Sequence, residues 1–178
     1  YFKPILDGRF VLGFRGEIGA LEAYGDTEVA PFFEHYYSGG ISSVRGFKQN
    51  TLGPRAIPSP YYIDNEGNPI LGQDGNPIMN PYSYYRDDRS IGGAYLIEGG
   101  FDFIFKLPFI EDQRSMRSSF FLDVGNVFSK DCGSDLSNIN CSELDLGELR
   151  YSFGVGVTWI TQLGPMSLAI AAPSNEGP

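Results

Sequence analysis

The chain has 178 residues and a net charge of −9, so it carries no basic surface for nucleic acid and no polybasic run for anionic lipid head groups. Its 23 glycines, 11 tyrosines and 14 phenylalanines favour β structure with many turns. No apolar run approaches the ~18 residues of a membrane-spanning helix, since the longest candidate, residues 103–110, is interrupted by Lys106 and Pro108. The chain begins at Tyr1 without a basic-then-apolar signal, so we expect an excised or mature segment.

The first predicted strand covers residues 9–20, and residues 1–5 are read as the tail of a further strand. Polar side chains occupy odd positions of the first predicted strand, among them Arg9, Arg15 and Glu17. The even positions are apolar or small: Phe10, Leu12, Phe14, Gly16, Ile18 and Ala20. A period of two predicts a strand with one apolar face and one polar face.

Residues 24–90 form a connection far longer than the about 12–15 residues usual for a loop, so this segment is either functional or disordered. It contains the stretch GGISSVRGFKQNTLGPR, in which Arg45 stands among glycines, serines and apolar residues. It also contains a repeated Gly-Asn-Pro-Ile, at residues 67–70 and 75–78, which predicts two turns and a short protruding hairpin.

The acidic residues beside this repeat are candidate calcium ligands. They are Asp64, Glu66 and Asp74, and their spacing does not match the loop of an EF-hand. We therefore predict no metal site.

Four more segments alternate in the same way: 94–107, 118–128, 149–160 and 166–172. The polar face of the first carries Glu98 and Asp102, and that of the second carries Asp123, although Phe121 and Val127 interrupt it. Because the alternation is regular, these three carboxylates are predicted to share the polar face of one sheet.

Between the predicted strands 118–128 and 149–160, Cys132 and Cys141 lie in a loop rich in glycine, serine and asparagine. Such a loop can bring two sulfurs together, so a disulfide and an oxidising compartment are predicted, with two free thiols as the alternative. A metal site is not expected, because the single histidine, His35, is distant in sequence.

The strands reach ten residues or more, close to the about 9–11 that cross a bilayer at a tilt. Short connections alternate with the long segments 24–90 and 129–148. We therefore predict an all-β fold: an antiparallel transmembrane β-barrel segment of about five to six strands of a larger barrel, with one long extracellular loop.

Aromatic residues near strand ends suit the interfacial girdles of such a barrel: Tyr95, Phe128, Tyr151 and Trp159. A soluble β-sandwich also explains the alternation, but it explains poorly why charges and glycines on one face lie opposite bulky aromatics on the other along such long strands.

Five or six strands are too few to close a membrane barrel. We therefore expect the segment to self-associate through its open strand edges.

The loop around Arg45 resembles the sixth extracellular loop of the BamA-type outer-membrane barrel insertases, whose hallmark is Val-Arg-Gly-Phe or Val-Arg-Gly-Tyr after Gly-Gly. The matching residues here are Val44, Arg45, Gly46 and Phe47, preceded by Gly39-Gly40. The stretches RSSFFLDVGNVF and WITQLGPM also resemble that family, so the likeness spans nearly the whole chain. Relative to the family, the N-terminal periplasmic domains, about the first ten strands and the final strand are missing.

The resemblance implies that residues 24–90 fold back into the barrel lumen, where Arg45 contacts the carboxylates of Asp123 and Asp102. A guanidinium offers paired donors to a carboxylate in a geometry that lysine cannot reproduce. Gly46 would allow a tight turn with a positive φ, and Phe47 would anchor the loop tip.

The function implied is the folding and insertion of β-barrel proteins into the bacterial outer membrane, without enzymatic chemistry or a cofactor. The implied partners are unfolded outer-membrane protein clients, accessory lipoproteins of the assembly complex and outer-membrane lipids. A polypeptide-secreting barrel of the two-partner type is the alternative, and a passive porin is a third possibility. On its own, the segment is expected to lack insertase activity.

Overall fold

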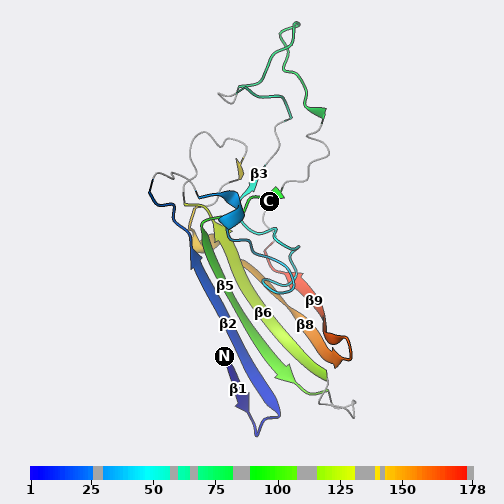
Figure 1. Cartoon of the computed structure of the whole chain (residues 1–178). Coiled ribbons are helices and arrows are strands. Elements are labelled where there is room, and N and C mark those ends of the chain that lie inside the picture. Colours follow the sequence, from blue (N-terminus) through cyan, green and yellow to red (C-terminus); the bar gives the residue numbers. More distant parts are fainter. Residues whose placement is uncertain are drawn as a thin grey trace.

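The computed structural model describes residues 1–25, 30–56, 60–64, 68–81, 89–107, 116–130, 139–140 and 143–175. Its main feature is one antiparallel sheet of six strands in the order β1-β2-β5-β6-β8-β9 (Figure 1). The strands are β1 Phe2–Ile5, β2 Phe10–Ala20, β5 Tyr95–Phe105, β6 Met116–Phe128, β8 Arg150–Thr161 and β9 Gly164–Pro173. The all-β antiparallel prediction is confirmed, including the short strand at the start of the chain.

The connections differ in length at the two ends of the sheet. A tight turn joins β1 to β2, and another joins β8 to β9 at the same end (Figure 1). At the other end, long connections join β2 to β5 and β6 to β8. The predicted arrangement of short turns and long loops is therefore present.

The two long connections are tied to each other by a second, small sheet. Its strands are β3 Arg55–Ala56, β4 Arg89–Ser90 and β7 Ile139–Asn140, in the order β4-β3-β7. Two 3-10 turns, η1 Phe32–Glu34 and η3 Leu146–Glu148, complete the regular elements of the described loops. Backbone pairing thus links the connection between β2 and β5 to the connection between β6 and β8.

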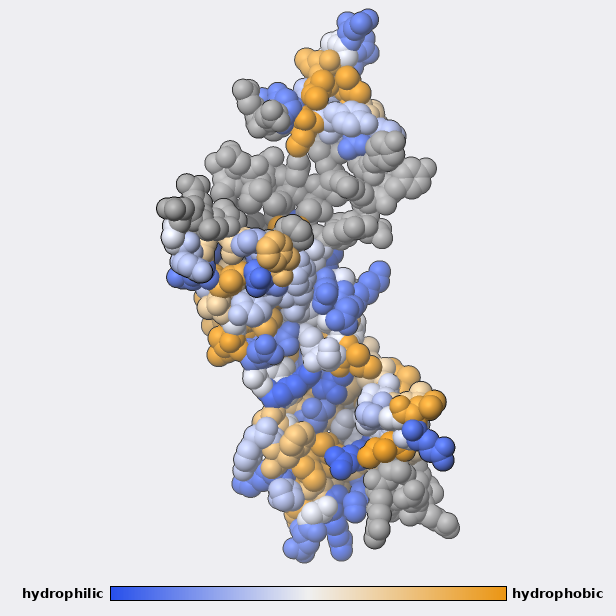
Figure 2. All heavy atoms as spheres, viewed as in Figure 1, coloured by the Kyte–Doolittle hydropathy of each residue, from blue (hydrophilic) through white to orange (hydrophobic). Residues whose placement is uncertain are grey.

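The described part of the Gly-Asn-Pro-Ile repeat, residues 68–70 and 75–78, lies in a protruding tip with antiparallel bridges, far from the main sheet (Figure 1), in agreement with the predicted protruding hairpin. Three short extended segments are joined pairwise by backbone hydrogen bonds. Tyr62 N donates to Ile78 O (3.0 Å), Ile78 N donates to Ile70 O (2.9 Å) and Ile70 N donates to Tyr62 O (2.8 Å). Figure 2 shows apolar side chains gathered on this tip, where Leu71 and Met79 are more than half exposed.

The acidic side chains of the tip support its turns. Asn68 N donates to Asp64 Oδ1 (2.9 Å), and Asn76 donates from its side chain and its backbone to Asp74 (3.0 and 3.2 Å). These hydrogen bonds hold the pKa of Asp74 below its usual value. Glu66 lies outside the described residues.

The two faces of the main sheet differ as the alternation predicts. The outer face, which carries Phe101 and its neighbours on adjacent strands, exposes large apolar side chains: Phe14, Ile18, Phe120, Leu122, Tyr151, Phe153, Val155, Met166, Leu168 and Ile170. Stacked rings cross this face, with centroids 5.2 Å apart for Phe10 and Phe103 and 5.1 Å apart for Phe105 and Phe120. The inner face carries Glu98, Asp102 and Asp123.

One member of the predicted girdle is placed differently. Phe128 is fully buried, and the loop backbone lies close to its own backbone, where a Cβ on Gly93 would collide with the Phe128 carbonyl. Tyr151 remains exposed, as expected of a girdle residue. Within the described ranges, no helix is long and apolar enough to cross a membrane.

The outer face yields the first prediction. Leu122→Arg in the full-length protein places a charge on the apolar face of β6, so it should lower the free energy of unfolding by about 2–4 kcal/mol if it lies near the bilayer centre. Urea titration of the protein folded in lipid vesicles measures this value. Ser119→Arg, on the inner face of the same strand, is the matched control, and an equal loss in both variants would contradict the assignment of faces.

Candidate functional site

The loop segment that contains Arg45 is shaped by its own backbone hydrogen bonds. Gly40 N donates to Val44 O (3.2 Å), Ser43 N donates to Gly40 O (3.1 Å), and Leu52 N donates to Ser38 O (3.1 Å). Val44 is buried, at 1% exposure. The loop therefore presents Arg45 from a compact turn.

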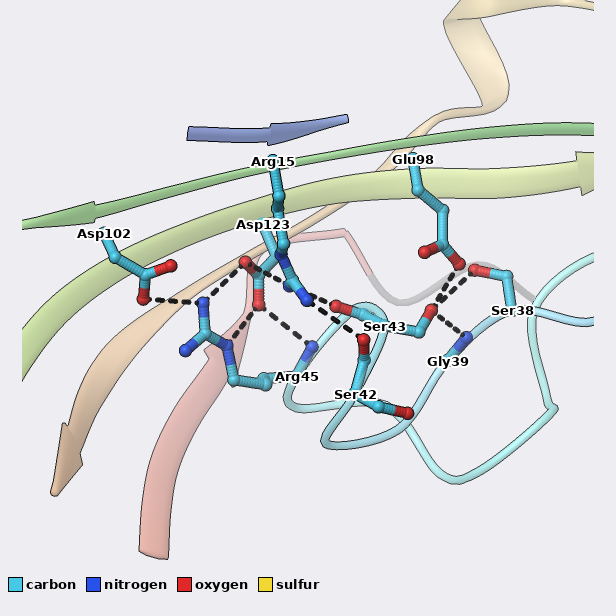
Figure 3. Close-up of polar contacts among 9 residues, drawn as sticks. All are labelled: Arg15, Ser38, Gly39, Ser42, Ser43, Arg45, Glu98, Asp102 and Asp123. Carbon is cyan, nitrogen blue, oxygen red and sulfur yellow. Dashed lines mark hydrogen bonds and ion pairs between the residues drawn. The ribbon is translucent and has the colours of Figure 1, made fainter. Parts of the chain in front are cut away.

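Arg45 makes a paired contact with Asp123 on the inner face of β6 (Figure 3). Its Nε donates to Asp123 Oδ2 (2.6 Å), its second guanidinium nitrogen donates to Oδ1 (2.8 Å), and its backbone N–H also donates to Oδ2 (3.1 Å). Asp123 has no solvent exposure and the Arg45 side chain has 14%. This bidentate, desolvated pair is the geometry that only an arginine provides.

Two further groups complete the surroundings of the guanidinium. Asp102 on β5 places Oδ1 3.0 Å from a terminal nitrogen of Arg45 (Figure 3). The ring of Phe121 on β6 lies beneath, with its centroid 3.7 Å from Arg45 Cζ. Arg45 is thus held by two carboxylates in front and an aromatic face below, which is a cation–π contact.

A second arginine reaches the same carboxylate from β2. Arg15 donates to Asp123 Oδ1 (2.7 Å), to the carbonyl of Ser42 (3.0 Å) and to the carbonyl of Ser43. Figure 3 shows Arg15 and Arg45 approaching Asp123 from different sides. The cluster of Arg15, Arg45, Asp102 and Asp123, here called the ionic cluster, has a formal charge of zero because its two cations balance its two anions.

Serine side chains attach the start of the turn to β5. Ser43 donates its hydroxyl to Glu98, while Gly39 N donates to Ser43 Oγ (2.9 Å) and the Ser38 hydroxyl lies 3.2 Å from it. Glu98 was predicted to lie on the polar face, and the structure gives it this loop contact. The turn is therefore fixed on both sides of Val44.

Glycines on the inner face make room for the large groups of the site. A Cβ at Gly125 would lie 2.9 Å from Val44, and one at Gly154 would lie 2.6 Å from the ring of Phe121. A Cβ at Gly100 would collide with Arg15. Each of these side chains thus lies over a residue without a side chain, which explains why charges and glycines share this face.

Position 46 requires a residue without a side chain for two reasons. Its φ is +97°, a region that other residues adopt only at a cost, and a Cβ there would lie 3.0 Å from Ala171 on β9 and 3.4 Å from Ser152 on β8. The turn after Arg45 therefore rests directly on these two strands. The adjoining Phe47 is half-buried.

The charges of the site keep Arg45 protonated. Burial alone would lower the pKa of Arg45, but the hydrogen bond and charge of Asp123, followed by those of Asp102, raise it above its usual value. The two carboxylates thus stabilise the charge of Arg45 inside the fold.

The structure brings together five of the predicted residues: Val44, Arg45, Gly46, Asp102 and Asp123. Phe47 follows them and is half-buried, and its role as the anchor of the loop tip stays a prediction. Cys132 and Cys141 lie outside the described residues, so the disulfide stays a prediction. No group of three or more potential metal ligands occurs in the described part of the chain.

Sequence reasoning missed Arg15 and Phe121 as partners in this site. Phe121 was treated as an irregularity of the polar face. Residues two apart in a strand lie on the same face, so the spacing of Phe121 and Asp123 could have predicted a ring beside that carboxylate. Arg15 was placed on the correct face, but its partner depends on the register between strands far apart in sequence.

The membrane-facing apolar side of the sheet, together with the loop docked on its inner side, defines the class as an outer-membrane β-barrel protein. The Omp85 superfamily domain matches residues 1–178, and the chain belongs to this superfamily.

The chain is similar to the outer membrane protein assembly factor BamA of Neisseria meningitidis serogroup B, at 32% identity over 192 residues, covering 100% of the chain and 21% of that protein. The crystal structure of BamA from Haemophilus ducreyi lacking POTRA domains 1-3 matches with a TM-score of 0.70 and 25% identity, over 99% of the chain and 30% of that structure. The chain thus spans less than a third of each.

The close approach of Gly46 leads to the second prediction. Gly46→Ala in the full-length protein should weaken loop docking by about 1–2 kcal/mol, and so speed trypsin cleavage after Arg45 roughly five- to thirtyfold, because the bond is protected only while the loop is docked. Gly75→Ala, which has a similar positive φ but open space around it, is the control. Equal cleavage of both variants would show that contact with β8 and β9 does not hold the loop.

Proposed function

We propose that this chain forms part of the machinery that folds β-barrel proteins and inserts them into the bacterial outer membrane. One observation carries the proposal: the loop arginine is bound bidentately to a fully buried aspartate on the barrel wall, in a chain similar over its whole length to assembly factors. Unfolded outer-membrane proteins are the proposed clients, and accessory lipoproteins and outer-membrane lipids are the proposed partners.

The docked loop acts as a brace across the inner face of the sheet. It contacts β2 through Arg15, β5 through Asp102 and β6 through Asp123. Gly46 rests against β8 and β9. A single loop segment therefore fixes the relative positions of five strands.

Such a brace suits a barrel that works on other strands. In the proposed mechanism, an incoming client strand pairs with an open strand edge of the complete barrel, where unpaired backbone groups serve as a template. The braced wall keeps one curvature while pairing changes elsewhere. The free energy comes from strand pairing and burial in the bilayer, so we propose a function without catalysis of a chemical step and without a cofactor.

We propose insertion of client proteins rather than secretion of a polypeptide by a two-partner barrel. Both relatives named here are BamA proteins, and the Neisseria relative is called an assembly factor. A secreting barrel would have to move its loop out of the lumen to pass a substrate, whereas this loop is attached to the wall by buried, charge-assisted bonds.

The third prediction tests this function through Arg45. In cells that depend on the full-length protein, Arg45→Gln should lower the levels of outer-membrane proteins. Asp123 then keeps only Arg15 and the backbone N–H of residue 45 as partners, and docking loses about 3 kcal/mol, the lower end of the range for a broken buried pair. In cells with Arg45→Lys, the levels of outer-membrane proteins should lie between those of Arg45→Gln and wild type. Lys48→Gln, in the exposed part of the same loop, is the control and should match wild type.

The location of the substrate separates insertion from secretion. In the same cells, client barrels should be lost from the membrane fraction, without a matching loss of a secreted polypeptide. The opposite result, loss of secretion with normal membrane insertion, would exclude the proposed function. Reversing the charges of Arg45 and Asp123 together is a poor test, since Asp123→Arg would face Arg15.

A further inference from the structure

Arg15 belongs to a row of residues that crosses the inner face. Arg15 is in register with Gly100, and Gly100 is in register with Asp123. Neighbouring strands lie about 4.8 Å apart, so Arg15 and Asp123 are roughly 10 Å apart at the backbone. A long side chain spans that distance only where nothing stands on the strand between.

Gly100 leaves that path open. A Cβ at this position would collide with Arg15 Nε and would lie 2.9 Å from Asp123 Oδ1. The next residue, Gly99, faces the other way, and a Cβ there would meet only Val124 and the Arg15 backbone, at 3.2 and 4.0 Å. The absence of a side chain therefore matters for Arg15 at Gly100 and not at Gly99.

The contacts of Arg15 divide between the wall and the loop. One terminal nitrogen donates to Asp123 Oδ1 (2.7 Å) and to the carbonyl of Ser43, and the other donates to the carbonyl of Ser42 (3.0 Å). The two carbonyls belong to the residues just before Val44 and Arg45. Arg15 serves the three acceptors from two nitrogens of a planar fork, a spacing of donors that the single nitrogen of an ammonium group does not reproduce.

We propose that Arg15 is a positioning residue, which holds the backbone before Arg45 against β2 so that the guanidinium of Arg45 meets Asp123. This role deepens the proposed function and rests on it. Oδ1 of Asp123 accepts hydrogen bonds from both Arg15 and Arg45, while Oδ2 accepts hydrogen bonds from Arg45 alone. The loop is consequently fastened to two strands that lie on either side of β5.

The simpler alternative is a solvated arginine that touches the cluster without controlling the loop, since its side chain is 38% exposed. Arg9 provides the comparison. It also belongs to the inner-face set of the first strand segment, but it lies in the turn between β1 and β2, at the opposite end of the sheet from the loop.

The experiment, which is the fourth prediction, uses the full-length protein in lipid nanodiscs and measures hydrogen exchange of peptides covering residues 39–47. Arg15→Gln and Gly100→Ala should both accelerate exchange about tenfold, as expected when charge-assisted hydrogen bonds to the loop are lost. Arg15→Lys should restore part of the protection. Arg9→Gln and Gly99→Ala are the matched controls and should exchange like wild type, as should the amides of β5 and β6 in all variants.

Four outcomes decide the inference. Faster loop exchange confined to Arg15→Gln and Gly100→Ala supports it. Wild-type exchange in both variants overturns it, and so does an equal acceleration in Gly99→Ala or Arg9→Gln, which would indicate general loosening. Loop acceleration, combined with loss of secretion and normal membrane insertion in cells carrying Arg45→Gln, supports the positioning role and excludes the proposed function, so the two failures are distinguishable.

Discussion

A carboxylate without solvent access must find all its partners inside the protein, because an unpaired buried charge destabilises a fold by several kcal/mol. Asp123 is such a group. Three of its hydrogen bonds come from Arg45 and one comes from Arg15. The loop cannot leave the wall without leaving Asp123 with one partner, so the burial of this single side chain fixes the loop, and the loop in turn braces the sheet.

The inner face is shaped to receive these groups as much as it is charged to attract them. Gly100, Gly125 and Gly154 lie beneath Arg15, Val44 and Phe121, respectively. A strand loses stability when glycine replaces a larger residue, so three glycines on adjacent strands need a reason. Here the reason is close approach, since a Cβ at each would meet a side chain from another strand or from the loop, and at Gly154 also the backbone of β9.

The period-two pattern was enough to predict the long strands and their faces, because the pleat determines which residues share a side. Arg45, Asp102 and Asp123 were found by combining that phase with a family resemblance. Arg15 was missed as a partner because the register of β2 against β5 and β6 is not readable across the long loop that separates them. Phe128 was assigned to the girdle wrongly, since the cover of a strand end depends on loop packing. Phe121 was not predicted as a site residue, because an apolar residue on a polar face was interpreted as an irregularity of the alternation.

An ionic cluster is an unusual way to fasten a loop, because replacing a buried ion pair by well-packed apolar residues is often neutral or stabilising. Its advantage is geometric. An apolar loop can slide along a wall and keep most of its contact area, whereas a guanidinium fork meets a carboxylate in one position, here over the ring of Phe121 and between Asp102 and Asp123. The cluster is neutral overall, so it stabilises one placement of the loop without attracting further ions. A brace that must hold a single curvature in a barrel wall needs that uniqueness more than it needs additional stability.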